Sequence, residues 1–236
     1  MNNIKQNLQQ VKERIRQAAE KSNRDPESIR LVAVSKTVPA ETIQKAIAAG
    51  VTILGESYIQ EARSKISAVS PPPASVSWHF IGHLQTNKAG YAVRLFDLIH
   101  SVDSFKLAHA LNREAGKINK IQAVLIQVNI AREKTKSGIA TQEARKLIAE
   151  IGTLSNIKVK GLMTMPPYFN NPEKARPYFD DLRLLSDQIK KNINPILTPN
   201  LSISELSMGM SGDFEVAIAA GATLVRIGTA IFGERN

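Results

Sequence analysis

The feature that most constrains the fold of this chain is an alternation that repeats along almost its whole length. A short apolar run rich in β-branched residues is followed by a polar turn and then by an amphipathic stretch with helical spacing. The apolar runs, which we expect to be strands, are 31–35, 51–54, 78–81, 98–101, 122–129, 158–163, 202–206 and 223–227. The amphipathic stretches, which we expect to be helices, are 40–49, 57–68, 86–95, 104–115, 141–154, 173–191 and 213–220.

This order of elements predicts an α/β fold. Continuously apolar strands that alternate with helices are typical of a parallel sheet covered on both faces. Eight such units in about 200 residues predict a single closed (β/α)8 barrel, a TIM barrel. A doubly wound open sheet is the structural alternative, because periodicity alone does not establish how many strands pair.

We expect one domain over residues 1–236. Ile4, Leu8, Val11 and Ile15 recur at helical spacing before the first strand, which predicts an extra N-terminal helix within 1–25 that packs on the barrel. The proline run 71–73 is expected to be a stiff loop inside the domain, since the alternation continues beyond it.

Composition excludes several classes of protein. The chain has no cysteine, so it has no disulfide framework, no thiolate zinc site and no thiol nucleophile. The first ten residues are polar and contain no apolar signal core, and no stretch reaches the ~20 apolar residues of a membrane span. We therefore expect a soluble, cytoplasmic protein.

The net charge of +10 raises the possibility of a nucleic-acid partner. The basic residues are spread along the chain, and the few aromatic residues do not alternate with them as a stacking platform would. The pattern favours a solvated basic surface and no nucleic-acid binding. An interaction protein that binds a polyanion is a third class of function, and a steep dependence of affinity on salt would be its sign.

Candidate chemistry lies where strands end, because barrel active sites form at the carboxyl ends of the strands. Lys36 directly follows the first apolar run. Desolvation there would lower the pKa of its amine, and a neutral lysine amine attacks carbonyl groups to form a Schiff base. Position alone favours a simpler interpretation, in which the side chain extends to water.

Two segments near the end of the chain resemble an anion site. Residues 207–213 are rich in Ser and Gly and open a helix, and Arg226 to Thr229 end the eighth strand. Small residues let backbone N–H groups approach an anion, and barrels commonly bind phosphate at the loops after strands seven and eight. A phosphate site together with a Schiff-base lysine predicts pyridoxal phosphate or a phosphosugar substrate of an aldolase.

Other candidate sites have weaker support. His79 and His83 are four residues apart, but His79 lies in a strand, where this spacing does not create a metal-binding face. No carboxylate cluster accompanies them, and no Ser/His/Asp arrangement stands out by spacing. We expect no metal site.

Seven ordered motifs carry a resemblance to a known family. They are Ala33-Val34-Ser35-Lys36-Thr37; Gly55-Glu56 with Tyr58 and Gln60-Glu61; Trp78-His79-Phe80-Ile81-Gly82 with Leu84-Gln85 and Asn87-Lys88; Lys136-Ser137-Gly138; Gly161-Leu162-Met163; Ser207-Met208-Gly209-Met210-Ser211 with Asp213; and Val225-Arg226-Ile227-Gly228-Thr229 with Ile231-Phe232-Gly233. Together they closely resemble the pyridoxal phosphate homeostasis protein family.

The resemblance implies a barrel like the N-terminal domain of alanine racemase and pyridoxal 5'-phosphate as cofactor. Lys36 matches the lysine that forms the internal aldimine, and Arg226 matches the arginine facing the pyridine nitrogen. The remaining residues expected to bind the cofactor are Ser57, Ser207, Met210, Ser211, Gly228 and Thr229. The family usually has Asn at the position of Ser57, and the shorter serine offers fewer hydrogen bonds.

The family has no established catalytic activity, so the resemblance implies a non-catalytic protein of vitamin B6 and amino-acid homeostasis. Its expected partners are the cofactor and the apo-enzymes that receive it, and a monomer is expected. An arginine cannot accept a hydrogen bond from the pyridine nitrogen, which weakens the ring as an electron sink and fits a carrier. Asn236 follows soon after the eighth strand, so we expect no second domain over the site. The alternative is a pyridoxal-phosphate amino-acid racemase or a related Schiff-base enzyme.

Overall fold

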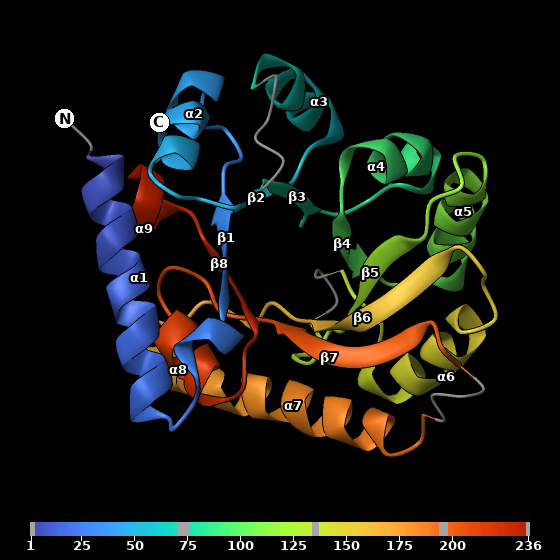
Figure 1. Ribbon diagram of the computed structural model, residues 1–236. Helices are drawn as coiled ribbons and strands as arrows, with labels where there is room; N and C mark the ends of the chain where they lie inside the picture. Colours follow the sequence, from blue (N-terminus) through green and yellow to red (C-terminus); the bar gives the residue numbers. More distant parts are fainter. Residues whose placement is uncertain (1–2, 70–75, 134–136, 194–197, 235–236) are drawn as a thin grey trace.

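The computed structural model describes residues 3–69, 76–133, 137–193 and 198–234 (Figure 1). The predicted loop at 71–73 and the motif residue Lys136 lie outside these residues. The described chain forms a closed barrel in which each strand pairs in parallel with the next and the last pairs with the first. The strands are β1 Arg30–Val34, β2 Ile53–Glu56, β3 Ser77–Phe80, β4 Leu98–Val102, β5 Gln122–Gln127, β6 Ile157–Met163, β7 Leu201–Ser207 and β8 Leu224–Ile227. The predicted TIM barrel is confirmed, and the open-sheet alternative is wrong.

Helices surround the barrel on its outside (Figure 1). They are α1 Ile4–Lys21, α2 Ala40–Ala48, α3 Ile59–Ala68, α4 Ala89–Leu95, α5 Phe105–Gly116, α6 Thr141–Ile151, α7 Arg176–Lys190, α8 Phe214–Ala219 and α9 Thr229–Phe232. Short 3-10 turns precede three elements, at Pro26–Ser28, Thr86–Lys88 and Pro172–Ala175. The stretch predicted as one helix over 86–95 is therefore a 3-10 turn followed by α4. The fifth predicted strand ends at Gln127, two residues early, because Val128 bridges Ile139 in the following loop.

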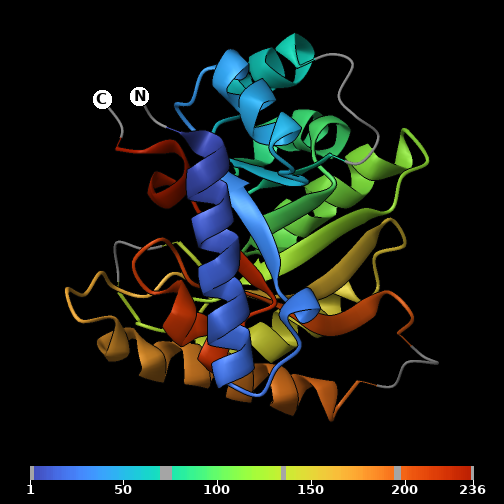
Figure 2. The ribbon, with the colours of Figure 1, turned by 60° about the vertical axis from the view of Figure 1, so that its left-hand side comes forward.

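The N-terminal helix α1 runs alongside α8 and α9 (Figures 1 and 2). Its apolar stripe, which includes Leu8 and Val11, is buried, and the Asn3 side chain accepts a hydrogen bond from the Gln6 amide at the helix start. The Asn7 side chain donates to the carbonyl of Ile231 in α9, at 3.0 Å. Packing and this bond together attach the first helix to the last segment of the barrel.

The apolar core has two parts. The larger part fills the space between the strands and the surrounding helices. The smaller part lies inside the barrel, where inward-facing side chains of six strands pack together as Val32, Ile53, Leu98, Leu125, Met163 and Leu224. This inner layer fills the interior, so the space that can hold a ligand lies at the carboxyl ends of the strands. Within the described residues, no helix is long and apolar enough to cross a membrane.

Candidate functional site

A cavity of about 310 Å³ lies at the carboxyl ends of the barrel strands. Seven of the eight predicted site residues line it, and they come from four separate segments of the chain. They are Lys36, Ser57, Met210, Ser211, Arg226, Gly228 and Thr229. Barrel closure therefore brings together residues that are almost 200 positions apart in the sequence.

Lys36 follows the last residues of β1 and is half-buried, with its side chain shared between this cavity and an adjoining groove. Ser35 before it is fully buried. Thr37 after it has a φ of 64°, in the left-handed region that β-branched residues rarely adopt. The backbone on either side of the lysine therefore requires support from its surroundings.

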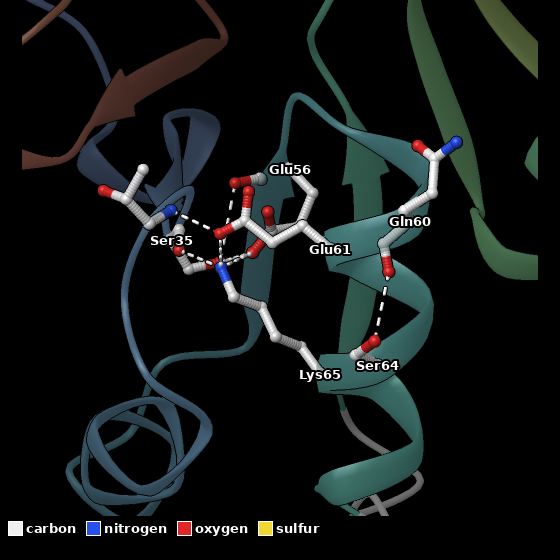
Figure 3. A network of polar contacts seen from close by, with 8 residues as sticks. Ser35, Glu56, Gln60, Glu61, Ser64 and Lys65 are labelled. Atoms are coloured by element: carbon white, nitrogen blue, oxygen red, sulfur yellow. Dashed lines mark hydrogen bonds and ion pairs between the residues drawn. The ribbon is translucent and has the colours of Figure 1, made fainter.

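That support comes from a group of polar side chains, which we call the Lys65 network: Ser35, Glu56, Glu61 and Lys65 (Figure 3). The Lys65 ammonium, on α3, donates to the Ser35 carbonyl at 2.6 Å and to Glu56 Oε1 at 2.9 Å. Its third contact is with the Glu61 carboxylate, one helical turn before it. All three donors of the ammonium therefore have acceptors.

The Lys65 network holds the chain on both sides of Lys36. The carbonyl of Ser35 accepts from Lys65, and the backbone N–H of Thr37 donates to the Glu61 carboxylate. The Ser35 hydroxyl also donates to Glu56 Oε1, at 2.6 Å. The strand end that carries Lys36 is thus tied to α3 through one ammonium and two carboxylates.

Glu56 is the buried carboxylate of this network, with no exposed surface. Burial raises its pKa, while hydrogen bonds from Ser35 and Lys65 act in the opposite direction. Its second oxygen, Oε2, has no hydrogen-bond partner among the described residues. Sequence reasoning quoted Glu56 and Glu61 as motif residues without a role and missed Lys65. The four-residue spacing between Glu61 and Lys65 was the available signal.

Arg226 forms part of the cavity floor and is almost completely buried, with 4% of its surface exposed. Its Nη1 donates to the Ser207 hydroxyl at 2.7 Å, and its Nη2 donates to the Thr164 carbonyl at 3.0 Å. Burial lowers the pKa of Arg226 to about 10, and the nearby Asp213 carboxylate opposes that shift. The guanidinium remains charged at neutral pH.

Ser207 is the predicted site residue that does not line the cavity. Its hydroxyl is fully buried beneath Arg226 and also lies 2.8 Å from Nδ1 of His100. Inward alternation along β7 directs the side chain into the barrel interior. The structure therefore places Ser207 as a support of Arg226.

The loop between β7 and α8 forms one wall of the cavity. Gly209 has a φ of +91°, and a Cβ there would lie 2.6 Å from the Cβ of Ala217, so only glycine fits. The Asp213 carboxylate accepts from the Met210 amide at 2.6 Å, which closes the turn. The Gly228 amide donates to the Ser211 hydroxyl, at 3.4 Å, so the loop after β8 meets the β7–α8 loop at this wall. Small side chains and backbone amides therefore line this wall.

Ser57 lies directly after β2 on another wall of the cavity. The chain at Gly82 packs closely against its backbone, because a Cβ at Gly82 would come within 2.2 Å of the Ser57 carbonyl oxygen. The short hydroxyl of Ser57 is thus presented from a fixed position at the strand end.

The two histidines considered for a metal site have other neighbours. His79 Nδ1 lies 3.0 Å from Nε2 of His100, and His83 Nδ1 lies 3.3 Å from the Ser137 hydroxyl. The part of the chain that the structure describes contains no group of three or more His, Cys, Asp or Glu side chains placed to hold a metal ion. Sequence reasoning missed His100, although its place in a buried strand was a signal.

A closed parallel barrel with a lysine, an arginine and an anion-type loop at its carboxyl end defines a class of small-molecule-binding α/β barrels. Residues 5–236 match the family described as alanine racemase, N-terminal domain. The chain is 44% identical to the pyridoxal phosphate homeostasis protein of Aquifex aeolicus, over 99% of each sequence. It is 41% identical to that of Escherichia coli K12, over 100% of this chain and 98% of that one.

The comparison with solved structures supports the same family. PipY of Synechococcus elongatus PCC7942, solved with PLP bound, is 34% identical, with a TM-score of 0.83 over 98% of this chain and 100% of that chain. The chain belongs to the pyridoxal phosphate homeostasis protein family, within the alanine racemase N-terminal domain fold. The resemblance found in the sequence motifs is confirmed.

Proposed function

We propose that this chain binds pyridoxal 5'-phosphate in the 310 Å³ cavity, with Lys36 as its covalent attachment point, and acts in cytoplasmic vitamin B6 and amino-acid homeostasis. The observation that carries the proposal is the convergence of Lys36, Arg226 and the Ser211 wall on one cavity. The names of the curated relatives and the PLP-bound PipY structure support the same cofactor.

The residues present fit this cofactor in shape and in chemistry. A cavity of this volume lies within the usual range for small-molecule sites. The wall formed by Ser211, Gly212, Gly228 and Thr229 presents hydroxyls and backbone amides, which are suitable donors for a phosphate group. Gly212 is open, since a Cβ there would meet nothing within 4 Å. Phosphate oxygens can therefore approach the backbone at this wall.

Arg226 supplies donors to the opposite part of the site. Two of its five N–H donors are used by Ser207 and Thr164, so three remain for other acceptors such as a ligand. An arginine donates only, which suits an unprotonated ring nitrogen of the cofactor. A carboxylate at this position would instead hold that nitrogen protonated and strengthen the ring as an electron sink. This difference favours binding and release of the cofactor over catalysis.

Pyridoxal phosphate supplies an aldehyde that a lysine amine can capture. In the proposed step, the lone pair of the Lys36 Nζ forms the bond to the aldehyde carbon. The two amine protons and the carbonyl oxygen leave as water, so a C=N bond remains and no oxidant or reductant is needed. The Lys65 network holds the Lys36 backbone while this bond forms and breaks. We infer that pyridoxal-phosphate-dependent apo-enzymes receive the released cofactor.

The test is borohydride trapping followed by peptide mass mapping of the protein incubated with pyridoxal phosphate. We expect a visible absorbance band that bleaches on reduction and a pyridoxyl adduct on Lys36. Lys36→Ala should lose the adduct at this position while remaining folded. Lys45→Ala, in an exposed pair with Glu41, is the matched control and should retain the Lys36 adduct. Absence of any band and any adduct in the wild type would contradict the proposal.

A second measurement separates a carrier from an enzyme. Amino acids incubated with the loaded protein in D₂O should show no sustained α-proton exchange, while an added apo-enzyme should gain activity. Steady α-deuteration or racemisation would support the alternative, a pyridoxal-phosphate enzyme.

A further inference from the structure

A continuous chain of polar side chains crosses the barrel interior beneath the cavity. It consists of Arg226, Ser207, His100 and His79, and we call it the Arg226–His79 chain. The successive distances are 2.7 Å from Arg226 Nη1 to Ser207 Oγ, 2.8 Å from Ser207 Oγ to His100 Nδ1, and 3.0 Å from His100 Nε2 to His79 Nδ1. β4 and β7 are not neighbours in the barrel, so the contact between His100 and Ser207 spans its interior (Figure 1).

The hydrogen bonds of this chain have one favoured direction. Arginine can only donate, so the Ser207 oxygen accepts from Arg226 and has one proton to place. Donating that proton to Nδ1 of His100 satisfies the hydroxyl completely. His100 then carries its own proton on Nε2 and donates it to Nδ1 of His79.

The opposite direction leaves a buried group unsatisfied. If His100 donated from Nδ1, the Ser207 hydroxyl would accept two hydrogen bonds and retain a proton with no acceptor among the described residues. An unsatisfied buried hydroxyl costs free energy that the first arrangement avoids. The donor-only character of Arg226 therefore determines the tautomer of both histidines.

Burial keeps both rings neutral. His100 has no exposed surface and His79 has 4%. Burial lowers the pKa of His79 to about 4 and that of His100 well below its ordinary value. The charged groups that act on the pair are Asp97, which favours protonation of His79, and Arg30 and Arg226, which disfavour protonation of one or both rings. The two neutral imidazoles can accept and donate hydrogen bonds along the Arg226–His79 chain, and they carry no positive charge that would repel the Arg226 guanidinium.

The chain determines how Arg226 is presented to the cavity. A serine hydroxyl rotates freely unless its proton has a fixed acceptor. With that proton held by His100, the Ser207 lone pair faces Nη1, while the Thr164 carbonyl holds Nη2. The guanidinium plane is then fixed at two points where Arg226 lines the cavity.

We propose that His100 and His79 are positioning residues, which act through Ser207 to fix the guanidinium of Arg226 at the cofactor cavity. The effect of this positioning on cofactor binding rests on the proposed function, because a displaced Arg226 would change how the cofactor ring is held. The hydrogen-bond direction itself needs no cofactor, so the two can be tested separately.

The first experiment uses nitrogen-15 NMR of the histidine rings in the protein without added cofactor. The signals are assigned with His79→Asn, His83→Asn, His100→Asn and His109→Asn. We expect His79 and His100 to be neutral and protonated on Nε2 from pH 5.5 to 8. A ring protonated on Nδ1, or a charged ring at pH 6.5, would overturn the proposal whether or not the cofactor binds.

The second experiment measures binding of pyridoxal phosphate to His100→Leu and Ser207→Ala. We expect the borohydride adduct to remain on Lys36, while the dissociation constant rises about tenfold and the pH profile of the bound absorbance band shifts. The double variant should bind pyridoxal phosphate no more weakly than the weaker-binding single variant, because both substitutions interrupt the same Arg226–His79 chain. His109→Leu, on the exposed face of α5, is the matched control.

A purely structural role would lower the melting temperature of these variants and leave the band and its pH profile unchanged, which would refute positioning. If His100→Leu does not fold, His79→Asn removes only the far end of the chain and should shift the same profile by a smaller amount. If the wild type binds no pyridoxal phosphate, the proposed function fails, and the NMR result still decides the direction of the chain.

Discussion

The ammonium of Lys65 lies 2.6 Å from the carbonyl oxygen of Ser35, the residue that precedes Lys36 in the chain. A lysine on α3 is thereby hydrogen-bonded to the strand end that carries Lys36. The same ammonium contacts two carboxylates, one of which accepts from the amide that follows Lys36. Two lysines of the same site therefore have different tasks, since one is held by carboxylates and the other lines the cavity.

Removal of Lys65 should be strongly destabilising. Lys65→Met leaves the Glu56 carboxylate buried without its cation, and breaking a buried pair in this way costs about 3–5 kcal/mol. Denaturant unfolding monitored by circular dichroism measures this change. The double variant Glu56→Gln with Lys65→Met should recover part of the loss. Lys45→Met, whose partner Glu41 is exposed, is the control and should leave stability nearly unchanged.

The left-handed backbone at Thr37 provides a second prediction. Thr37→Gly relieves a conformation that costs a non-glycine residue about 1–2 kcal/mol, and this gain offsets the ~0.5–1 kcal/mol entropic cost of glycine. We expect stability to remain the same or to rise slightly, while capture of pyridoxal phosphate by Lys36 becomes slower. Unfolding and stopped-flow absorbance measure the two effects. A loss of stability above about 2 kcal/mol would show that Thr37 stabilises the loop in its native conformation.

Two glycines in the same cavity wall form a matched pair. Gly209→Ala forces a Cβ to within 2.6 Å of Ala217 at a φ of +91°, so we expect a loss of about 2 kcal/mol and weaker cofactor binding. Gly212→Ala places a Cβ in open space and should change stability by less than about 0.5 kcal/mol. Thermal unfolding of both variants measures the contrast. Equal effects would mean that the wall adjusts freely at Gly209.

The buried imidazole of His79 should make folding sensitive to acid. Its pKa is about 4 in the folded state and about 6.5 when unfolded, so the unfolded chain binds more protons between these values. Stability should therefore fall as the pH decreases from 6.5 towards 4. The carboxyls of Glu56 and Asp213, whose pKa values burial raises, act in the opposite direction.

A comparison of variants isolates the histidine contribution. The decrease in the free energy of unfolding from pH 7 to 4.5 should be about 2 kcal/mol smaller in His79→Asn than in the wild type. His109→Asn controls for the loss of an imidazole from an exposed position. If the free energy of unfolding decreases equally in His79→Asn and in the wild type, the group that titrates is not His79.

Most of the fold could be predicted because its signals are local. Apolar runs and amphipathic stretches reflect which face of a strand or helix is buried, and the predicted strands lie within two residues of the observed ones. The cavity residues could be grouped because carboxyl ends of parallel strands meet at one end of a barrel. Lys36 and Arg226 became candidates from their place after or within a strand, but position alone favoured a Lys36 that extends to water. The family resemblance supplied the expected role of each residue.

The sequence by itself therefore determined the barrel, the end at which its cavity lies and the family to which it belongs. Only the tertiary structure decided which polar groups touch. The bonds from Lys65 to Ser35 and from His100 to Ser207 join residues 30 and 107 positions apart. Such contacts depend on strand register and on closure of the barrel, because a shift of one residue turns a side chain from the interior to the helices. For this reason Ser207 lies under Arg226, and two buried histidines support the site from inside the barrel.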